Sequence, residues 1–269
     1  MQRLWNGIKL VWLNAGFYSA LLLMTVVGIG VVSGPLYCWF RYVRCYSRGW
    51  SVRMLIWLYG RAWAKLVAFF VPLRLENCGG PLPSPCIFVP NHQSFFDTYC
   101  FGFLPEPNVV FAVRAWPFRI PFYGLYMRYA EYLNVEETAA DEMFATATEL
   151  LARGTSVTIF PEGTRSRDGN LQRFHSGAFR LAFAANIPIV PICIFGTGQF
   201  LRRGGFLLRP ATVSVRVLPP VHPQDYAQHG VEAHLVLRRS VKAQLQLALD
   251  DLLGEKSEEV TTVCQKEFV

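Results

Sequence analysis

The stretch from Leu10 to Val32, LVWLNAGFYSALLLMTVVGIGVV, carries no charged side chain, and Asn14 and Ser19 are its only notably polar residues. About 20 apolar residues suffice for a helix to cross the hydrocarbon layer of a membrane. A cleaved signal peptide is the alternative, but the stretch is too long and no clean small-residue cleavage site follows it. We predict a membrane-seated helix that either spans the bilayer or lies in its interface.

The excess positive charge is confined to the N-terminal part of the chain. Residues 1–75 hold nine Lys and Arg and no Asp or Glu, whereas the remainder holds 17 basic and 19 acidic residues. Four arginines follow the apolar stretch and two basic residues precede it, so the positive-inside rule places the C-terminal side in the cytoplasm. For a bacterial protein this predicts the inner membrane. An N-terminal quarter that is basic but also this apolar is atypical of DNA-binding domains, so we expect no nucleic acid partner. The four arginines are Arg41, Arg44, Arg48 and Arg53.

The next segment, residues 51–75, has two interpretations. Arg61 and Lys65 share one face of a helix, while Leu, Trp and Phe fill the others. This pattern favours a helix in the membrane interface, with its apolar side in the acyl chains and its basic side on anionic head groups. The alternative is a core helix whose cations extend to solvent at its edge.

The cysteines indicate a reducing compartment. Seven are scattered along the chain, an odd number, and none forms a C-x-x-C pair. They are expected to be free thiols rather than a disulfide framework or a zinc site.

Beyond a Gly/Pro-rich loop at residues 76–85 the chain changes character. Short β-rich runs alternate with helical patterns, the clearest of which is residues 137–154, ending at Gly154. This alternation predicts an α/β domain with a mostly parallel sheet flanked by helices. We therefore divide the chain into membrane-anchoring helices (1–75), the α/β domain (76–253, closed by a helix over 231–253) and a polar tail (254–269). The predicted strands are residues 86–90, 108–113, 156–160, 187–195 and 212–218.

Two polar motifs follow predicted strands, where ligand-handling residues collect in parallel sheets. The first is His92 through Asp97. A neutral imidazole can accept a proton from a hydroxyl group, and a carboxylate on its other nitrogen fixes the tautomer. In the alternative interpretation Asp97 caps a helix and His92 is an ordinary surface residue; an isolated H-x(4)-D pattern is more often of this kind.

The second motif, PEGTRS at residues 161–166, changes that balance. Gly163 allows close backbone approach to a ligand, Thr164 can donate a hydrogen bond, and Arg165 can bind two phosphate oxygens at once. The alternative is a surface turn with solvated arginines. Glu162 is a poor phosphate ligand, and we expect it to orient Arg165 or a substrate hydroxyl.

Together, the two motifs identify the chain as similar to the glycerolipid acyltransferases, specifically the 1-acylglycerol-3-phosphate acyltransferases. The family's N-H-x(4)-D block corresponds to residues 91–97, and its F-P-E-G-T-R-S block to residues 160–166, about seventy residues later. Further similarities are RIPFYG (119–124), FHSGAFRLA (174–182) and IPIVPICIFGT (187–197). The resemblance covers roughly residues 76–220 and extends loosely to the N-terminus.

Two departures from the family pattern concern candidate site residues. His175 stands where many members have lysine; it is a second candidate base, ranked below His92 because no carboxylate stands at a matching spacing. Around residues 112–117, Arg114 is the nearest cation where the family carries lysine, and it is expected to contribute to phosphate binding.

The resemblance implies a reaction and its partners. His92, held by Asp97, takes the proton from the sn-2 hydroxyl of lysophosphatidic acid as that oxygen attacks an acyl thioester of coenzyme A or acyl carrier protein. Arg165, with Gly163 and Thr164, holds the phosphate. No acyl-enzyme, cofactor or metal is expected. The products are phosphatidic acid and a free thiol carrier.

Other functions stay open at this stage. The acceptor can be another lyso-lipid, such as a lyso-ornithine lipid, whose carboxylate Arg165 would bind. The chain can also be a lipid or thioester hydrolase, or a non-catalytic membrane adaptor. Acyl-chain length, the identity of the donor and the oligomeric state are not predicted.

Overall fold

A computed structural model describes residues 2–266 of the chain, with side-chain surroundings for residues 7–255. Within it, seven strands form one sheet in the order β1-β7-β6-β2-β5-β3-β4. All strand pairs are parallel except β6 with β7, so the predicted mostly parallel α/β fold is confirmed. The strands are β1 (Leu73–Asn77), β2 (Ile87–Pro90), β3 (Val109–Val113), β4 (Leu133–Asn134), β5 (Ser156–Thr158), β6 (Ile189–Phe195) and β7 (Val213–Val217).

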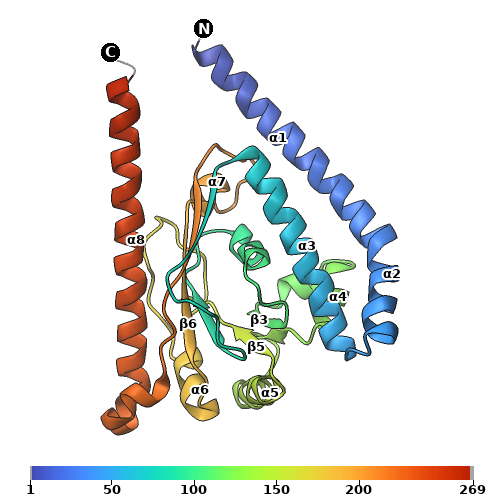
Figure 1. The fold of residues 1–269 in the computed structure, drawn as a ribbon, viewed down its shortest axis with the longest axis vertical. Helices are drawn as coiled ribbons and strands as arrows, with labels where there is room; N and C mark the ends of the chain where they lie inside the picture. The colour runs from blue at the N-terminus through green and yellow to red at the C-terminus, as the bar shows by residue number, and fades with distance from the viewer. Residues whose placement is uncertain (1, 267–269) are drawn as a thin grey trace.

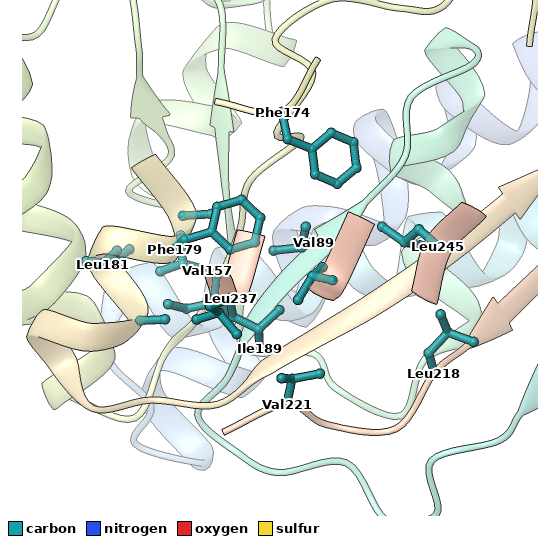
Figure 2. Packing of buried hydrophobic residues seen from close by; sticks show 14 of the residues in the cluster. Val89, Val157, Phe174, Phe179, Leu181, Ile189, Leu218, Val221, Leu237 and Leu245 are labelled. Atoms are coloured by element: carbon teal, nitrogen blue, oxygen red, sulfur yellow. The ribbon is translucent and has the colours of Figure 1, made fainter. Parts of the chain in front are cut away.

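Helices cover both faces of the sheet (Figure 1). On one face lie α5 (Ala140–Ala152), α6 (Gly177–Ala185) and α8 (Ala233–Lys266), whose apolar side chains form one buried cluster with the sheet (Figure 2). The other face is covered by the 3-10 helix η3 (Phe95–Phe103) and, beyond it, α3 (Arg48–Phe70). The interior strand β6 is buried along its whole length and sends alternate side chains into the two clusters, as a strand covered on both faces must.

The remaining elements connect these layers. Two N-terminal helices precede the sheet, α1 (Gln2–Val27) and α2 (Ser33–Cys38). The π-helical turn η1 (Gly28–Val32) joins them, and a second one, η2 (Trp39–Val43), follows α2. The 3-10 helix η4 (Trp116–Arg119) and α4 (Tyr123–Tyr129) lie between β3 and β4. The short α7 (Thr197–Phe200) follows β6, and the 3-10 helix η5 (Pro223–Glu232) precedes α8.

The apolar N-terminal stretch has two different faces. Leu13 and Phe17 on α1 are buried against the α/β domain, whereas Trp12 and Leu22 are 55% and 66% exposed. Asn14, one of the two notably polar residues of the stretch, binds both backbone groups of Leu208 across this contact, at 3.0 and 2.8 Å. By length and composition, the helical stretch Gly7–Val43 is able to cross a membrane. Arg3, which we counted among the flanking charges, lies outside the described side chains.

Helix α3 differs from the interfacial helix that we favoured. Its residues Trp63 and Val67 are buried, and Gly60 packs so closely on η3 that a Cβ on Gly102 would lie 2.2 Å from the Gly60 carbonyl carbon. Arg53, one of the four arginines counted for the positive-inside rule, is 4% exposed and pairs with Glu131 at 2.8 Å. The core-helix interpretation therefore describes the inner face of α3 better. Arg61 and Lys65 are exposed, as both interpretations expect.

The two ends of the sheet domain also differ from prediction. Strand β1 was missed because its residues were assigned to the preceding helix, so the predicted boundary at residues 75 and 76 falls inside a strand. Val71 is already extended, and Pro72 cannot continue a helix. At the other end α8 continues past Gly254 to Lys266, where we predicted a tail, and Glu255 binds Arg216 of β7 at 2.9 Å. The six cysteines that the structure describes are free; the seventh, Cys264, lies outside the described side chains.

Candidate active site

The two polar motifs lie side by side at one edge of the sheet. The first follows β2 and the second follows β5, and these strands are parallel neighbours. Their carboxyl ends therefore open at the same edge. A backbone hydrogen bond from the Ser166 amide to the His92 carbonyl, at 2.7 Å, joins the two loops directly.

His92 and Asp97 meet at the start of η3. The imidazole Nδ1 lies 2.7 Å from Asp97 Oδ2, and the same oxygen accepts the backbone amides of Gln93 and Ser94 at 2.6 and 2.8 Å. The carboxylate is fully buried and the imidazole is 18% exposed. Asp97 therefore caps a helix, as one interpretation held, and also holds the histidine. With Nδ1–H donated to Asp97, the lone pair of Nε2 is available to a substrate.

A third polar side chain, Thr197, completes the surroundings of Asp97. Its hydroxyl donates to Asp97 Oδ1 at 2.6 Å, and Thr197 is itself 1% exposed. Sequence reasoning did not single it out as a site residue. A signal was present, because Thr197 comes just after β6, which runs parallel to β2 and ends at the same edge of the sheet.

Glu162 has a different set of partners from the one we expected. One carboxylate oxygen accepts the backbone amide of His92 and the other that of Gln172, both at 2.9 Å. Burial raises the pKa of this carboxyl, and the two amides and His92 partly offset that rise. The side chain thus positions the loop that carries His92, rather than orienting Arg165.

Arg165 is a half-buried cation without an acceptor. Within the described part of the chain, no group accepts a hydrogen bond from its guanidinium, whereas its backbone carbonyl accepts one from Arg203 at 3.0 Å. Burial and the neighbouring Arg203 lower its pKa. A bound anion would relieve both effects.

The residues before Arg165 form an open turn. Gly163 has a positive φ of +68°, which favours glycine, and a Cβ there would lie 3.5 Å from the ring of His175. Thr164 is exposed beside it. The candidate His175 thus lies next to Gly163, and its backbone amide binds the Pro161 carbonyl at 2.8 Å.

Arg114 stands at the carboxyl end of β3, at the same edge but two strands away from β2. Its guanidinium pairs with Glu136 at 2.5 Å, and the second carboxylate oxygen of Glu136 accepts the Ala115 amide at 2.9 Å. Arg114 therefore has a carboxylate partner, unlike Arg165.

An apolar cavity of about 720 Å³ opens on the η3 side of the site. Phe95, Thr98 and Tyr99 line it from η3, immediately after the His92 loop. Its other walls come from the N-terminal helices α1 and α2 with the turn η1 between them, and from α3, β3 and the segment from Ile120 to Met127. A chain of methylene groups is the kind of ligand that such walls accommodate.

Comparisons with known proteins agree on one family. The acyltransferase family model matches residues 77–195. A 1-acyl-sn-glycerol-3-phosphate acyltransferase of Salmonella typhimurium is 31% identical over 189 residues, covering 69% of this chain and 74% of the relative. One from Limnanthes douglasii is 25% identical over 229 residues, covering 82% and 78%.

The fold has a counterpart among solved structures. The crystal structure of a 1-acyl-sn-glycerophosphate acyltransferase from Thermotoga maritima superposes with a TM-score of 0.71, covering 94% of this chain and 98% of that chain at 24% identity. This likeness bears out the fold, including the helices that precede the sheet.

Proposed function

Because the chain belongs to the 1-acyl-sn-glycerol-3-phosphate acyltransferase family, we propose that it moves a fatty acyl group from a thioester to the sn-2 hydroxyl of lysophosphatidic acid. The products are phosphatidic acid and a free thiol. The observation that carries the proposal is the contact of His92 Nδ1 with the buried Asp97 carboxylate, beside the cation of Arg165, which forms no ion pair with any described side chain.

His92 acts as the general base in this reaction. Its Nε2 takes the proton of the acceptor hydroxyl while the hydroxyl oxygen forms a bond to the thioester carbonyl carbon. When the carbon–sulfur bond breaks, the imidazolium returns the proton to the departing thiolate. Asp97 stabilises the imidazolium between these steps, and Thr197 and the amides of Gln93 and Ser94 keep the carboxylate in place.

Arg165 is the proposed partner of the acceptor phosphate. The phosphate is separated from the sn-2 hydroxyl by only two carbons, so a cation that binds it must lie close to His92. The loops of Arg165 and His92 are joined through Ser166. Fixing the phosphate there would hold the hydroxyl against Nε2, and orientation of this kind accounts for much of catalysis in two-substrate reactions. Gly163 and Thr164 provide the open turn around it, and Arg114 is farther along the sheet edge.

The membrane contact follows from exposed apolar side chains outside the sheet. They lie on α1, on the π-helical turns η1 and η2, and at the turn before α4, where Phe122 is 69% exposed. Lysophosphatidic acid keeps its acyl chain in the leaflet, so an enzyme seated on these surfaces reaches the head group without extracting the lipid. We assign the α/β domain to the cytoplasmic face, in line with the basic residues that follow the apolar stretch.

The test compares three histidine variants in the release of thiol from an acyl thioester in the presence of lysophosphatidic acid. His92→Ala is expected to lower kcat by roughly 10²- to 10⁴-fold, the usual contribution of a general base. His229→Ala, an exposed histidine of η5, serves as the matched control. Loss of activity in His175→Ala instead of His92→Ala would show that His175, not His92, is the base. Acceptor-independent thiol release would favour a hydrolase, and activity with another lyso-lipid alone would change the substrate.

A further inference from the structure

A second, cationic cleft of about 1070 Å³ opens on the other side of the His92 loop. Its walls are the turn that follows the PEGTRS motif, α7 with the loop after it, and the part of α8 at Leu249 and Leu253. In Figure 1 the orange segment with α7 lies between α8 and α3. Four arginines line the cleft, against one carboxylate, Asp168; they are Arg167, Arg202, Arg203 and Arg209.

These arginines are not neutralised within the described part of the chain, where none of the four forms an ion pair. The Asp168 carboxylate is bound by the Ser166 hydroxyl and by the side-chain and backbone N–H groups of Asn170. A concave surface lined by one sign of charge concentrates the electrostatic potential inside it and attracts anions. Guanidinium groups in particular fit phosphate oxygens.

The cleft begins one residue from the proposed base. Gln93, which follows His92, lines it, and a Cβ on Gly198 of α7 would lie 3.3 Å from the Gln93 side chain. Next to Gly198, Thr197 binds Asp97; farther along the same segment, the Leu201 carbonyl accepts the Ser94 hydroxyl at 3.2 Å. The His92 loop therefore has the cationic cleft on one side and the apolar cavity, reached at Phe95, on the other.

We propose that this cleft binds the phosphate-bearing nucleotide of an acyl-coenzyme A donor, an assignment that rests on the acyl transfer proposed above. Such a donor has an apolar chain at one end, several phosphate charges at the other and the reacting thioester between them. The apolar cavity, the His92 loop and the arginine-lined cleft follow one another in the same order. The exposed side chain of Leu253, at the rim, offers an apolar surface to the base of the nucleotide.

Two other anions fit the cleft less well. The phosphate of the acceptor has to stay near the reacting hydroxyl, and one phosphate leaves most of a 1070 Å³ cleft empty. An acidic helix of a carrier protein would need cations on an open surface, whereas these arginines line a concavity of about 1070 Å³, slightly above the roughly 300–1,000 Å³ typical of small-molecule sites.

The experiment is a comparison of donors with the full-length chain in lipid vesicles. The double variant Arg202→Gln/Arg209→Gln removes two exposed cleft arginines and leaves Arg203, which contacts Arg165, in place. The control, Arg180→Gln/Arg239→Gln, removes the same charge from exposed positions on α6 and α8 outside the cleft. KM is measured for acyl-coenzyme A, for the matching acyl-pantetheine, which has no phosphates, for acyl carrier protein thioester and for lysophosphatidic acid.

We expect the cleft variant to raise the KM for acyl-coenzyme A by roughly 10- to 100-fold, as the loss of hydrogen bonds between charged groups does. The KM values for acyl-pantetheine and for lysophosphatidic acid should stay within about two-fold of the parent chain. The control should leave all four values unchanged.

Three results would overturn the assignment. They are a rise confined to lysophosphatidic acid, a rise confined to the carrier protein thioester, and an equal change for acyl-coenzyme A and acyl-pantetheine. Titration with free coenzyme A, which cannot react, measures binding at the cleft separately from acyl transfer. If the parent chain binds coenzyme A and the cleft variant does not, while neither transfers an acyl group to lysophosphatidic acid, the cleft is a coenzyme A site but the proposed function is wrong. If the two bind coenzyme A equally, the cleft assignment fails whatever the activity.

Discussion

Replacing Thr197 by valine removes one hydroxyl group from a fully enclosed part of the site. Valine has nearly the same shape, so the main change is the loss of the 2.6 Å hydrogen bond to Asp97 Oδ1. Thr197 is 1% exposed and Asp97 0%, so water is poorly placed to replace the hydroxyl. A buried acceptor left without its donor costs about 1–3 kcal/mol, and more when it is charged.

That cost lowers either the stability of the fold or the rate of the catalysed reaction. If Asp97 keeps its position, Thr197→Val lowers the free energy of unfolding by about 1–3 kcal/mol. If the carboxylate turns away from His92 to find another donor, kcat falls by roughly 5- to 150-fold, the same energy expressed as a rate. Because Thr197 does not touch the substrates, the KM values should change little.

The assay pairs steady-state kinetics with denaturant unfolding. Thr197→Ser is the matched variant, because it keeps the hydroxyl and removes only a methyl group. It should retain most of the kcat. Equal losses in the serine and valine variants would mean that packing, not the hydrogen bond, holds the site. A valine variant with unchanged stability and kcat would refute the reasoning altogether.

Two further predictions concern the contact of α3 with the sheet domain. Gly102→Ala should destabilise the fold by about 1–3 kcal/mol or more in thermal unfolding, since the new Cβ would overlap the α3 backbone. Gly60→Ala, whose Cβ would meet Gly102 Cα at 3.4 Å, should be nearly neutral in the same measurement. Glu131→Gln leaves Arg53 buried without its charge partner and should cost about 1–2 kcal/mol, less than a fully buried pair because Glu131 is 37% exposed. Burial opposes ionisation of Glu131, but Arg53 and Arg153 bring its pKa below the usual value. The contribution of Glu131 to the free energy of unfolding is therefore present above its pKa in the unfolded state and is lost as the pH falls through its pKa in the folded state. The variant should therefore lose less stability on acidification than the parent chain; an equally steep loss would contradict this.

The sheet and the location of both motifs were predictable because they depend on local patterns. Buried parallel strands appear as short apolar runs, and a polar motif directly after such a run lies at the carboxyl edge wherever the strand sits in the sheet. The capping role of Asp97 and its contact with His92 also follow from a short spacing, since five residues at the start of a helix suffice to bring them together.

The features that were not predicted from the sequence depend on contacts between residues far apart in the chain. The bond of Thr197 to Asp97 spans one hundred residues; the place of Thr197 just after a strand indicates the edge of the sheet, but not this partner. The burial of Arg53 was not predicted because its partners, Asn108 and Glu131, come from a different part of the chain. The partners of Glu162 are backbone amides, which have no signature in the sequence at all.

The central claim is that the acyl group leaves the thioester only by transfer to the lyso-lipid hydroxyl. The most direct test is the stoichiometry of one reaction of purified protein with acyl-coenzyme A, with and without lysophosphatidic acid, in which released thiol and the acyl position in the lipid product are both measured. We expect one phosphatidic acid, acylated at sn-2, for each thiol, and no thiol above background without the acceptor. Thiol release that continues without the lyso-lipid, or that exceeds the phosphatidic acid formed, would contradict the account.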